Sequence, residues 1–426
     1  MATLAETGTI QADTDHVKEK TDGRIEQRVS FVEARLLAET IVTGDGHFRF
    51  AVAEAGKTQV VESVSQGKKQ IVPSYSLRVL WDTGLVRFPS GIALCGSTEA
   101  LIEEIKEFIS RYANLPAEWL EIIALYILMT WVYDRFTAVP YLRFLGEPGT
   151  GKTRLLLICA AISYKGMVAS GNITGPALFR TIDLVRGTMA VDEGDFRDSQ
   201  EWSDIIKVLN NGYTPGTPVI RCGHQGEDFE PRAFFVYGPK IISTRSRFAD
   251  EALESRCLTL ETREGPLPAH IPLQLPLSFE KEALTLRNKL LKWRFDNFHL
   301  IDAREGEMRD LFPRSGQIGA SLAAVAPTTE SRSRLVSFLS RHDAEQREDS
   351  PKGIVLQALG KVAERGGSAA TVGELAEAAN EISRSLGADD LTAKRVGGIL
   401  RSLGIIPRRT KNGYVVNLSA HKEAAA

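Results

Sequence analysis

The residues best suited to do chemistry lie in a glycine-rich segment, GEPGTGKT, that runs from Gly146 to Thr153. It matches the pattern GxxxxGK[ST], in which glycines let successive backbone N–H groups turn toward phosphate oxygens. The lysine of this pattern reaches the β- and γ-phosphates of ATP, and the hydroxyl after it binds Mg²⁺. We therefore predict that ATP and Mg²⁺ are held by the loop and the start of the next helix: Gly146, Glu147, Pro148, Gly149, Thr150, Gly151, Lys152, Thr153 and Arg154.

A second apolar run, TMAVDE, ends in the carboxylates Asp192 and Glu193. In enzymes with such a loop, the first carboxylate holds the water shell of Mg²⁺ and the second polarises the attacking water. We expect Thr153 and Asp192 at the metal, and Lys152, Asp192 and Glu193 in catalysis. An acidic strand end is a weak signal alone and a strong one beside the glycine-rich loop.

The elements that must position these residues are those of an α/β fold. Between residues 137 and 265, short apolar runs alternate with helical stretches, which is typical of a parallel sheet covered by helices. The predicted strands are YLRFL, GMVAS, TMAVDE, KIIST and CLTLET. The first lies directly before the glycine-rich loop, and the helical TRLLLICAA follows it.

This core resembles the AAA+ class of P-loop ATPases, in which an extra strand lies between the loop and the carboxylates. KIIST is similar to the AAA+ sensor-1 strand, whose polar tip detects the γ-phosphate, and this implies a catalytic role for Thr244, with Ser243 as the second choice. In LESRCLTL, an arginine directly precedes a strand, as in minichromosome-maintenance helicases. The resemblance implies that Arg256 is an arginine finger reaching the γ-phosphate of a neighbouring subunit.

The motifs between Tyr141 and Phe298 together resemble ATPases of phages, plasmids and integrated elements, related to superfamily III and minichromosome-maintenance-like helicases. They are YLRFLGEPGTGKTR, GTMAVDEGDF, IIKVLNNGY, YGPKIIST and ALESRCLTLE. The resemblance implies a homo-oligomeric ring, most simply a hexamer, with ATP between subunits. It also implies DNA and a primase or other replication protein as partners.

Two β-prone runs between residues 210 and 240, TPVIRC and AFFVYG, resemble the hairpin that such helicases project into their central channel. This implies DNA contacts by Arg221, His224 and Arg232. The tip also carries Glu227, Asp228 and Glu230, so its charge favours DNA only weakly.

Residues 351–418 have the length and order of a winged helix: three helices and a closing hairpin. Between residues 394 and 411 there are six basic residues and no acidic one. A basic recognition helix and wing are expected to meet DNA phosphates; the alternative is a solvated face of a protein–protein module. The predicted DNA-binding residues are Lys394, Arg395, Arg401, Arg408, Arg409 and Lys411.

The rest of the chain divides by composition. We expect a disordered tail at residues 1–28, a small strand-rich α+β module at 29–97, a helical linker region at 98–136, the AAA+ core at 137–265 and a helical segment at 266–345. In the module, HFRFAVAEA, TQVVESV and SLRVLWDTGLVRF are the expected strands.

The composition of the chain argues against several classes of protein. The 426 residues have a formal net charge of −2, so a nucleic-acid surface must be local. The four cysteines form no CxxC pair and the seven histidines show no metal spacing, which argues against a zinc site or a disulfide framework. The longest apolar run falls short of the roughly 20 residues of a membrane helix. We expect a cytoplasmic protein with no membrane partner.

These observations favour an ATP-hydrolysing AAA+ motor that acts on DNA, a replicative helicase of a mobile element. The alternative is a loader or scaffold ATPase that places a replication or transposition protein on DNA without unwinding, which the acidic hairpin tip favours. A third hypothesis, a non-enzymatic regulator, conflicts with the presence of Lys152, Asp192 and Glu193.

Overall fold

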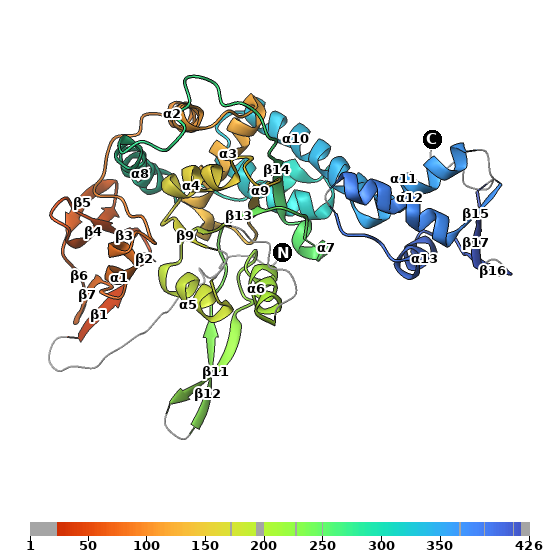
Figure 1. Ribbon diagram of the computed structural model, residues 1–426. Helices are drawn as coiled ribbons and strands as arrows, with labels where there is room; N and C mark the ends of the chain where they lie inside the picture. The colour runs from red at the N-terminus through yellow and green to blue at the C-terminus, as the bar shows by residue number, and fades with distance from the viewer. Residues whose placement is uncertain are drawn as a thin grey trace, which may run out of the picture.

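The computed structural model describes residues 24–170, 173–192, 200–225, 228–248, 250–365, 368–386, 388–411 and 413–418. Figure 1 shows three parts in chain order: a strand-rich module at one side, a central α/β core, and a C-terminal part that projects from the opposite side. Within the described ranges, no helix is both long enough and apolar enough to cross a bilayer.

The N-terminal module contains two small sheets and a short helix. One sheet has the strand order β1-β7-β6 and the other the order β2-β3-β4-β5. The elements are β1 Arg24–Arg28, β2 Ser30–Glu33, β3 Leu36–Val42, β4 Phe48–Glu54, β5 Lys57–Val61, β6 Val64–Gln66, β7 Lys69–Pro73 and α1 Leu77–Asp82.

The structure differs from two expectations for this module. Residues 24–28, expected in a loose tail, form β1, which pairs in parallel with β7. Part of the run SLRVLWDTGLVRF, expected to be a strand, forms α1 instead. Its apolar residues Leu77, Leu80 and Trp81 recur at helical spacing and pack against one core.

The core is built on five parallel strands in the order β14-β8-β13-β10-β9. They are β8 Tyr141–Leu145, β9 Met167–Ala169, β10 Met189–Val191, β13 Lys240–Thr244 and β14 Cys257–Glu261. These are the runs that the sequence predicted as strands, and the α/β fold class is confirmed. Successive strand side chains point to opposite faces, so Leu142 and Phe144 enter one apolar core and Tyr141 enters another.

Helices cover both faces of this sheet. The first core contains side chains of α2, α3, α4, α8, α9 and α10, and the second contains side chains of α5, α6 and α7. Their bounds are α2 Thr98–Tyr112, α3 Ala117–Thr130, α4 Lys152–Ile162, α5 Gly175–Val185, α6 Gln200–Asn211, α7 Glu251–Glu254, α8 Ser278–Asn297, α9 Pro313–Val325 and α10 Thr329–Glu348. The longest apolar run of the sequence is α3, whose residues 122–130 are all buried.

A two-stranded antiparallel hairpin, β11 Val219–Gln225 and β12 Asp228–Phe234, projects from the core between α6 and β13 (Figure 1). The buried ammonium of Lys240 holds its root, because Nζ donates to the carbonyl oxygens of Gly212, Val236 and Gly238 at 2.9, 2.6 and 2.8 Å. Burial lowers the pKa of Lys240. The hairpin is thereby fixed to the first residue of β13.

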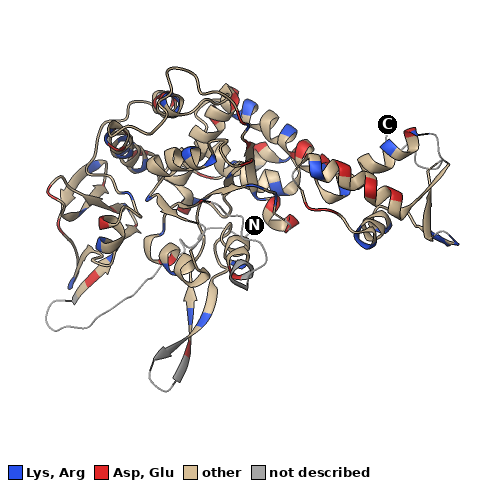
Figure 2. Ribbon diagram, viewed as in Figure 1, with Lys and Arg blue, Asp and Glu red and all other residues tan. Residues whose placement is uncertain are grey.

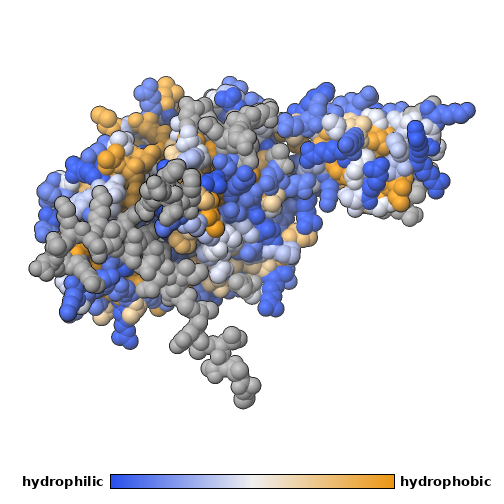
Figure 3. All heavy atoms as spheres, turned by 90° about the horizontal axis from the view of Figure 1, so that it is seen from below, coloured by the Kyte–Doolittle hydropathy of each residue, from blue (hydrophilic) through white to orange (hydrophobic). Residues whose placement is uncertain are grey.

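The C-terminal part has its own apolar core. Its elements are α11 Pro351–Glu364, β15 Ala369–Thr371, α12 Val372–Ser385, α13 Ala393–Ser402, β16 Arg408–Thr410 and β17 Gly413–Asn417. The three helices and the hairpin agree with the expected order, and the short strand β15 adds a third strand to the sheet β15-β17-β16. Figure 3 shows this part standing out from the core with a largely hydrophilic visible face.

A buried charge cluster joins the N-terminal module to the core. Glu39 of β3 accepts hydrogen bonds from Arg294 of α8 at 2.8 Å and from the Tyr164 hydroxyl at 2.7 Å. Lys165 lies 3.2 Å from the same carboxylate, and Asp134 pairs with Arg294 at 2.7 Å. Glu39, Lys165 and Arg294 are at most 2% exposed. The charges stay buried because each has an opposite charge in contact.

Replacing Glu39 by glutamine should destabilise the protein, because two buried cations lose a charged partner. Breaking a buried pair from one side costs about 3 kcal/mol or more in free energy of unfolding. Chemical unfolding followed by tryptophan fluorescence measures the loss. Glu330→Gln is the matched control, since its pair with Arg334 is more than half exposed and such pairs contribute about 1 kcal/mol or less. Equal effects of the two variants would contradict the structural role of Glu39.

Candidate nucleotide site

The glycine-rich loop begins where β8 ends and is clamped to the end of β14. A Cβ on Gly146 would collide with Oγ1 of Thr262 and lie 2.5 Å from the carbonyl oxygen of the same residue, so only glycine fits there. The Thr262 hydroxyl also lies 2.7 Å from the Thr150 hydroxyl in the loop. Gly149 and Gly151 adopt φ values of +86° and +87°, which glycine tolerates. These contacts give the loop one defined shape.

Helix α4 starts at Lys152, directly after Gly151. Its first backbone N–H groups have no partner within the helix, which makes a helix start suited to anions. The Lys152 ammonium folds back over the loop and donates to the carbonyl oxygen of Glu147 at 2.7 Å. The exposed residues Glu147, Pro148 and Gly149 form the outer part of the loop.

Three oxygen-bearing side chains meet beside this loop. The Thr153 hydroxyl donates to Oδ1 of Asp192 at 3.1 Å, and the Ser243 hydroxyl donates to the same oxygen at 2.5 Å. Thr153 is on α4, Asp192 follows β10, and Ser243 is near the end of β13. The structure therefore brings the two residues expected at the metal into contact, and Glu193 lies outside the described residues.

This donor set suits Mg²⁺. Magnesium is usually held by one or two protein oxygens, while the phosphates and water complete its shell. Thr153 and Asp192 offer a hydroxyl and a carboxylate at the mouth of a loop with glycines at positive φ. No cluster of three or more metal-ligating side chains occurs in the described residues, so nothing there suggests a separate metal centre.

Ser243, rather than Thr244, is the sensor-strand residue that contacts Asp192. Adjacent residues of a strand face opposite sides, so only one of them can reach the carboxylate. Thr244 contributes its backbone, since its carbonyl oxygen accepts from the Gly146 N–H at 3.1 Å. Its buried hydroxyl has no hydrogen-bond partner within the described chain. The first choice made from the sequence is therefore the less well placed of the two.

Arg154, which the sequence predicts to bind nucleotide, contacts a different segment in this structure. Its guanidinium donates to the carbonyl oxygen of Pro272 at 2.6 Å and also to that of Leu273. It thereby ties the segment after β14 to the first turn of α4. These contacts direct the side chain toward that segment instead of the loop.

Arg256 lies at the edge of the sheet opposite its own glycine-rich loop. Its carbonyl oxygen accepts from the N–H of Tyr141, the first residue of β8, whereas the loop follows the last residue of that strand. The guanidinium is 4.1 Å from the centre of the Tyr213 ring and donates to Asn210. Arg256 is only 7% exposed. It cannot serve the loop of its own chain.

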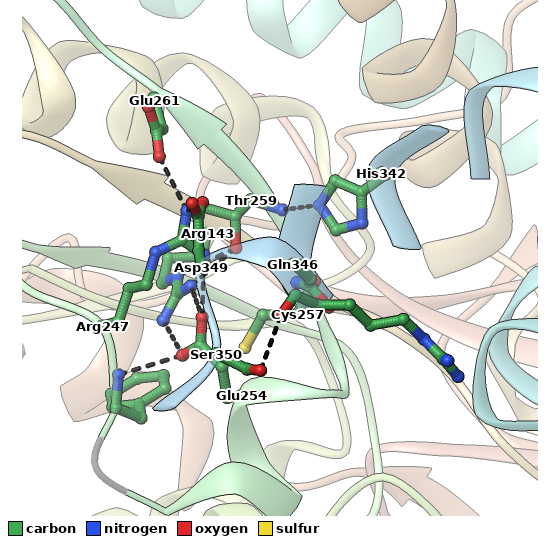
Figure 4. Close-up of polar contacts among 12 residues, drawn as sticks. Arg143, Arg247, Glu254, Cys257, Thr259, Glu261, His342, Gln346, Asp349 and Ser350 are labelled. Carbon is green, nitrogen blue, oxygen red and sulfur yellow. Dashed lines mark hydrogen bonds and ion pairs between the residues drawn. The ribbon is translucent and has the colours of Figure 1, made fainter. Parts of the chain in front are cut away.

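A buried ionic network connects the loop strand to the C-terminal part (Figure 4). Arg143, in the middle of β8, is fully buried and forms a two-point ion pair with Glu254 of α7. Arg247 bonds to the same carboxylate at 3.3 Å, to Glu261 at 2.8 Å and to Asp349 at 2.7 Å. Burial acts to raise the pKa of Glu254, but Arg143 and Arg247 outweigh it and the pKa is lowered. The sequence feature that indicates this network is Arg143, a charged residue inside the otherwise apolar run YLRFL.

His342 of α10 completes the network on the other side of β14 (Figure 4). Its Nε2 accepts a hydrogen bond from the backbone N–H of Thr259 at 3.0 Å, which requires the neutral ring. Burial lowers the pKa of His342 to about 4. Helix α10 is thereby attached to the edge strand of the sheet.

The predicted DNA-contacting residues lie on two separate surfaces. Arg221 and Arg232 face each other across the hairpin ladder, and the side chain of His224 lies outside the described part. The six basic residues between residues 394 and 411 are all exposed, on α13, on β16 and in the turn after it: Lys394, Arg395, Arg401, Arg408, Arg409 and Lys411. Figure 2 shows blue segments on the hairpin, on α13 and at the tip of the C-terminal sheet.

Comparisons with known proteins give only remote likenesses. No family model matches the chain, and no curated protein matches it. Among solved structures, the SCCmec type IV Cch active helicase is 13% identical, with 93% of this chain and 80% of that chain covered and a TM-score of 0.45. The NrS-1 C-terminal region is 10% identical, with 89% and 96% covered and a TM-score of 0.34. A full-length MCM homolog from Methanopyrus kandleri is 11% identical, with 72% and 76% covered and a TM-score of 0.36. These values are too low to assign a function.

Replacing Gly146 by alanine should abolish binding of Mg²⁺-ATP, because the added methyl group collides with Thr262 and deforms the loop. Thermal unfolding with and without Mg²⁺-ATP measures this directly, since a ligand at 100 times its Kd stabilises the folded state by about 2.7 kcal/mol. Gly360→Ala on α11 is the control, because its added Cβ meets nothing within 4 Å and it should keep the full shift. If Mg²⁺-ATP raises the unfolding temperature of Gly146→Ala as much as that of the unaltered protein, the nucleotide binds elsewhere.

The hydrogen bond to His342 should make stability depend on pH. The ring must stay neutral in the folded protein, whereas an unfolded histidine takes up a proton near its ordinary value of 6.5. The contact therefore contributes its full stabilisation above about pH 6.5. The free energy of unfolding falls by up to about 3 kcal/mol as the pH decreases toward 4. In His342→Gln, whose amide oxygen can accept the same bond, the decline over that interval should be smaller. Identical pH profiles for the two proteins would contradict a neutral buried ring.

Proposed function

We propose that this chain is an ATP-hydrolysing AAA+ enzyme that acts on DNA as a ring, a replicative helicase of a mobile element. The contact of Thr153 and Ser243 with Asp192 at the mouth of the glycine-rich loop is the observation that carries the proposal. It places a metal-binding hydroxyl, a carboxylate and a proposed phosphate sensor on three neighbouring elements. A loop that only capped a turn would need none of them.

The roles of the residues follow from their positions. The backbone N–H groups of the loop and the start of α4 would bind the phosphates, and Lys152 would leave the Glu147 carbonyl to pair with them. Thr153 and Asp192 would hold Mg²⁺, which supplies neutralisation of phosphate charge. Glu193 follows Asp192 in the sequence and is proposed to orient the attacking water. Ser243 would detect the phosphate through Asp192.

The place of Arg256 at the opposite edge of the sheet supports the proposed ring. A finger there can act only on the loop of a second copy, and its side chain must leave Tyr213 and Asn210 to do so. The proposed assembly is a hexamer in which each site combines Lys152 of one subunit with Arg256 of the next. Heterologous contacts of this kind form a ring when the rotation between subunits closes, and the proposed assembly requires that closure.

DNA is the proposed polymer because two cationic surfaces lie outside the nucleotide site. The C-terminal part combines three helices with a three-stranded sheet, which supports a winged helix with α13 as recognition helix and β16–β17 as wing. The six exposed basic residues between residues 394 and 411 would contact phosphates. A primase or another replication protein remains a proposed partner on the strength of the sequence resemblance alone.

The second candidate is a loader or scaffold ATPase that does not separate strands. The far end of the hairpin favours this candidate, because two acidic residues lie in its strands near the turn. In the ladder, Glu230 is opposite Gly223 and Asp228 is opposite Gln225. Acidic residues at that position would repel a DNA strand that a motor had to grip there.

Two variants mixed in equal amounts test both the site and the ring. Lys152→Ala should lose ATP turnover because its loop cannot hold the phosphates. Arg256→Ala should lose it because each loop then lacks the arginine of the neighbouring subunit. In mixed rings about a quarter of the interfaces combine an intact loop with an intact finger, so turnover should return. Steady-state phosphate release measures it.

Arg256→Ala must keep the stabilisation by Mg²⁺-ATP in thermal unfolding, which separates loss of the finger from loss of the fold. A mixture as inactive as its two components would contradict a finger supplied by a neighbour. Full turnover of Lys152→Ala alone would contradict the proposed nucleotide site.

A further inference from the structure

The proposed finger Arg256 shares one aromatic ring with a second arginine. Its guanidinium lies 4.1 Å from the centre of the Tyr213 ring, and the guanidinium of Arg314 on α9 lies 4.9 Å from the same point. Tyr213 follows the end of α6. Burial acts to raise the pKa of the Tyr213 hydroxyl, but the two arginines outweigh it and the pKa is lowered. Both cations therefore act on this one side chain.

The position of Arg256 lacks the partner that a buried cation normally has. The side chain is 7% exposed, yet it forms no ion pair within the described residues, and its Nε has no hydrogen-bond partner there. It donates to the amide oxygen of Asn210, whose own Nδ2 donates to Asp250 at 2.8 Å. Arg143 and Arg294, by contrast, each keep a carboxylate in contact. Arg256 is held by a ring and an amide, and leaving these costs less than breaking a buried ion pair.

The ring is the fixed partner in this contact and the guanidinium is the movable one. The N–H of Val139 donates to the carbonyl oxygen of Tyr213 at 3.0 Å. The carbonyl oxygen of the preceding residue, Gly212, accepts from the buried ammonium of Lys240 at 2.9 Å. The backbone that carries the ring is thus tied to the core on both sides. A change of rotamer in Arg256 breaks the contact without moving that backbone.

We propose that Tyr213 is a positioning residue that holds Arg256 withdrawn and thereby limits the fraction of fingers that reach a neighbouring loop. The inference rests on the proposed role of Arg256 as a finger. A guanidinium over the ring cannot contact the phosphates of the next subunit, so only the fingers that have left the ring support hydrolysis. Arg314 keeps the hold weak, because two like charges beside one ring repel each other. The phosphates of bound ATP then compete with the ring for the guanidinium.

Steady-state phosphate release by the full chain at saturating Mg²⁺-ATP tests the inference. Tyr213→Leu and Tyr213→Met each remove the ring and keep an apolar side chain, so kcat should rise several-fold, the range expected for loss of one cation–π contact. Tyr213→Phe keeps the ring and should keep kcat near that of the unaltered protein. In Arg256→Ala, the further change Tyr213→Leu should have no effect, because no finger is left to release.

Phe235→Leu is the matched control. Phe235 also has an arginine over its ring, Arg186 at 4.5 Å, but that arginine is paired with Asp183 at 2.7 Å. This variant should leave kcat unchanged.

Three results would overturn the inference and leave the proposed function standing. The first is an unchanged or lower kcat in both Tyr213→Leu and Tyr213→Met, the second an equal rise in Tyr213→Phe, and the third a rise that persists without Arg256. If Arg256→Ala hydrolyses ATP as fast as the unaltered protein, the proposed finger is wrong and the inference fails with it.

Discussion

The ion pair between Arg143 and Glu254 is the constraint on which the rest of the core depends. The guanidinium of Arg143 in the middle of β8 is buried completely, so loss of its carboxylate partner would lower the free energy of unfolding by several kcal/mol. The carboxylate sits on α7, between the sensor strand and Arg256. Arg247 shares it and reaches Asp349 just before α11. One buried charge thereby connects β8, helix α7 next to Arg256, and the segment that precedes α11.

Strand order explains why the nucleotide site forms where it does. Because β13 lies between β8 and β10, the loop after β8, Ser243 on β13 and Asp192 after β10 end at the same edge of the sheet. The same strand carries Lys240 at its other end, where the ammonium holds the root of the hairpin. A short rigid strand therefore connects the group that contacts Asp192 to the element proposed to hold DNA. This arrangement gives a direct route by which a change at the phosphates reaches the hairpin.

The sequence predicted the elements of this site well and some of its side chains less well. A glycine-rich loop, an apolar strand and an acidic strand end are local patterns, so the five strands and the contact of Thr153 with Asp192 were expected. Which of Thr244 and Ser243 reaches Asp192 depends on the face to which each strand residue points, and in the structure it is Ser243 that contacts this carboxylate. The contacts of Arg154 with the segment after β14 could not be read from the sequence, because that segment is remote along the chain.

The contacts of Arg180 with the rings of Phe179 and Phe234 at the base of the hairpin were also not evident from the sequence. Arg221 and Arg232 were named from the likeness to a helicase hairpin, but Arg180 lies on a helix that precedes it and no spacing connects the three. Only the packing of Phe179 on Phe234 brings them together. Similarly, nothing in the sequence distinguished Arg256 as an exposed finger from the side chain that the structure stacks on Tyr213. Contacts between distant segments decide such questions, and local patterns do not contain them.

The most direct test of an ATP-driven motor is displacement of a labelled strand from forked DNA, with Glu193→Gln as the control that should bind ATP without hydrolysing it. If the chain is an ATP-driven motor, strand release requires ATP and Mg²⁺ and is lost in Glu193→Gln. If DNA stimulates ATP hydrolysis and no strand is released, the chain is not a helicase and the loader or scaffold is the better description.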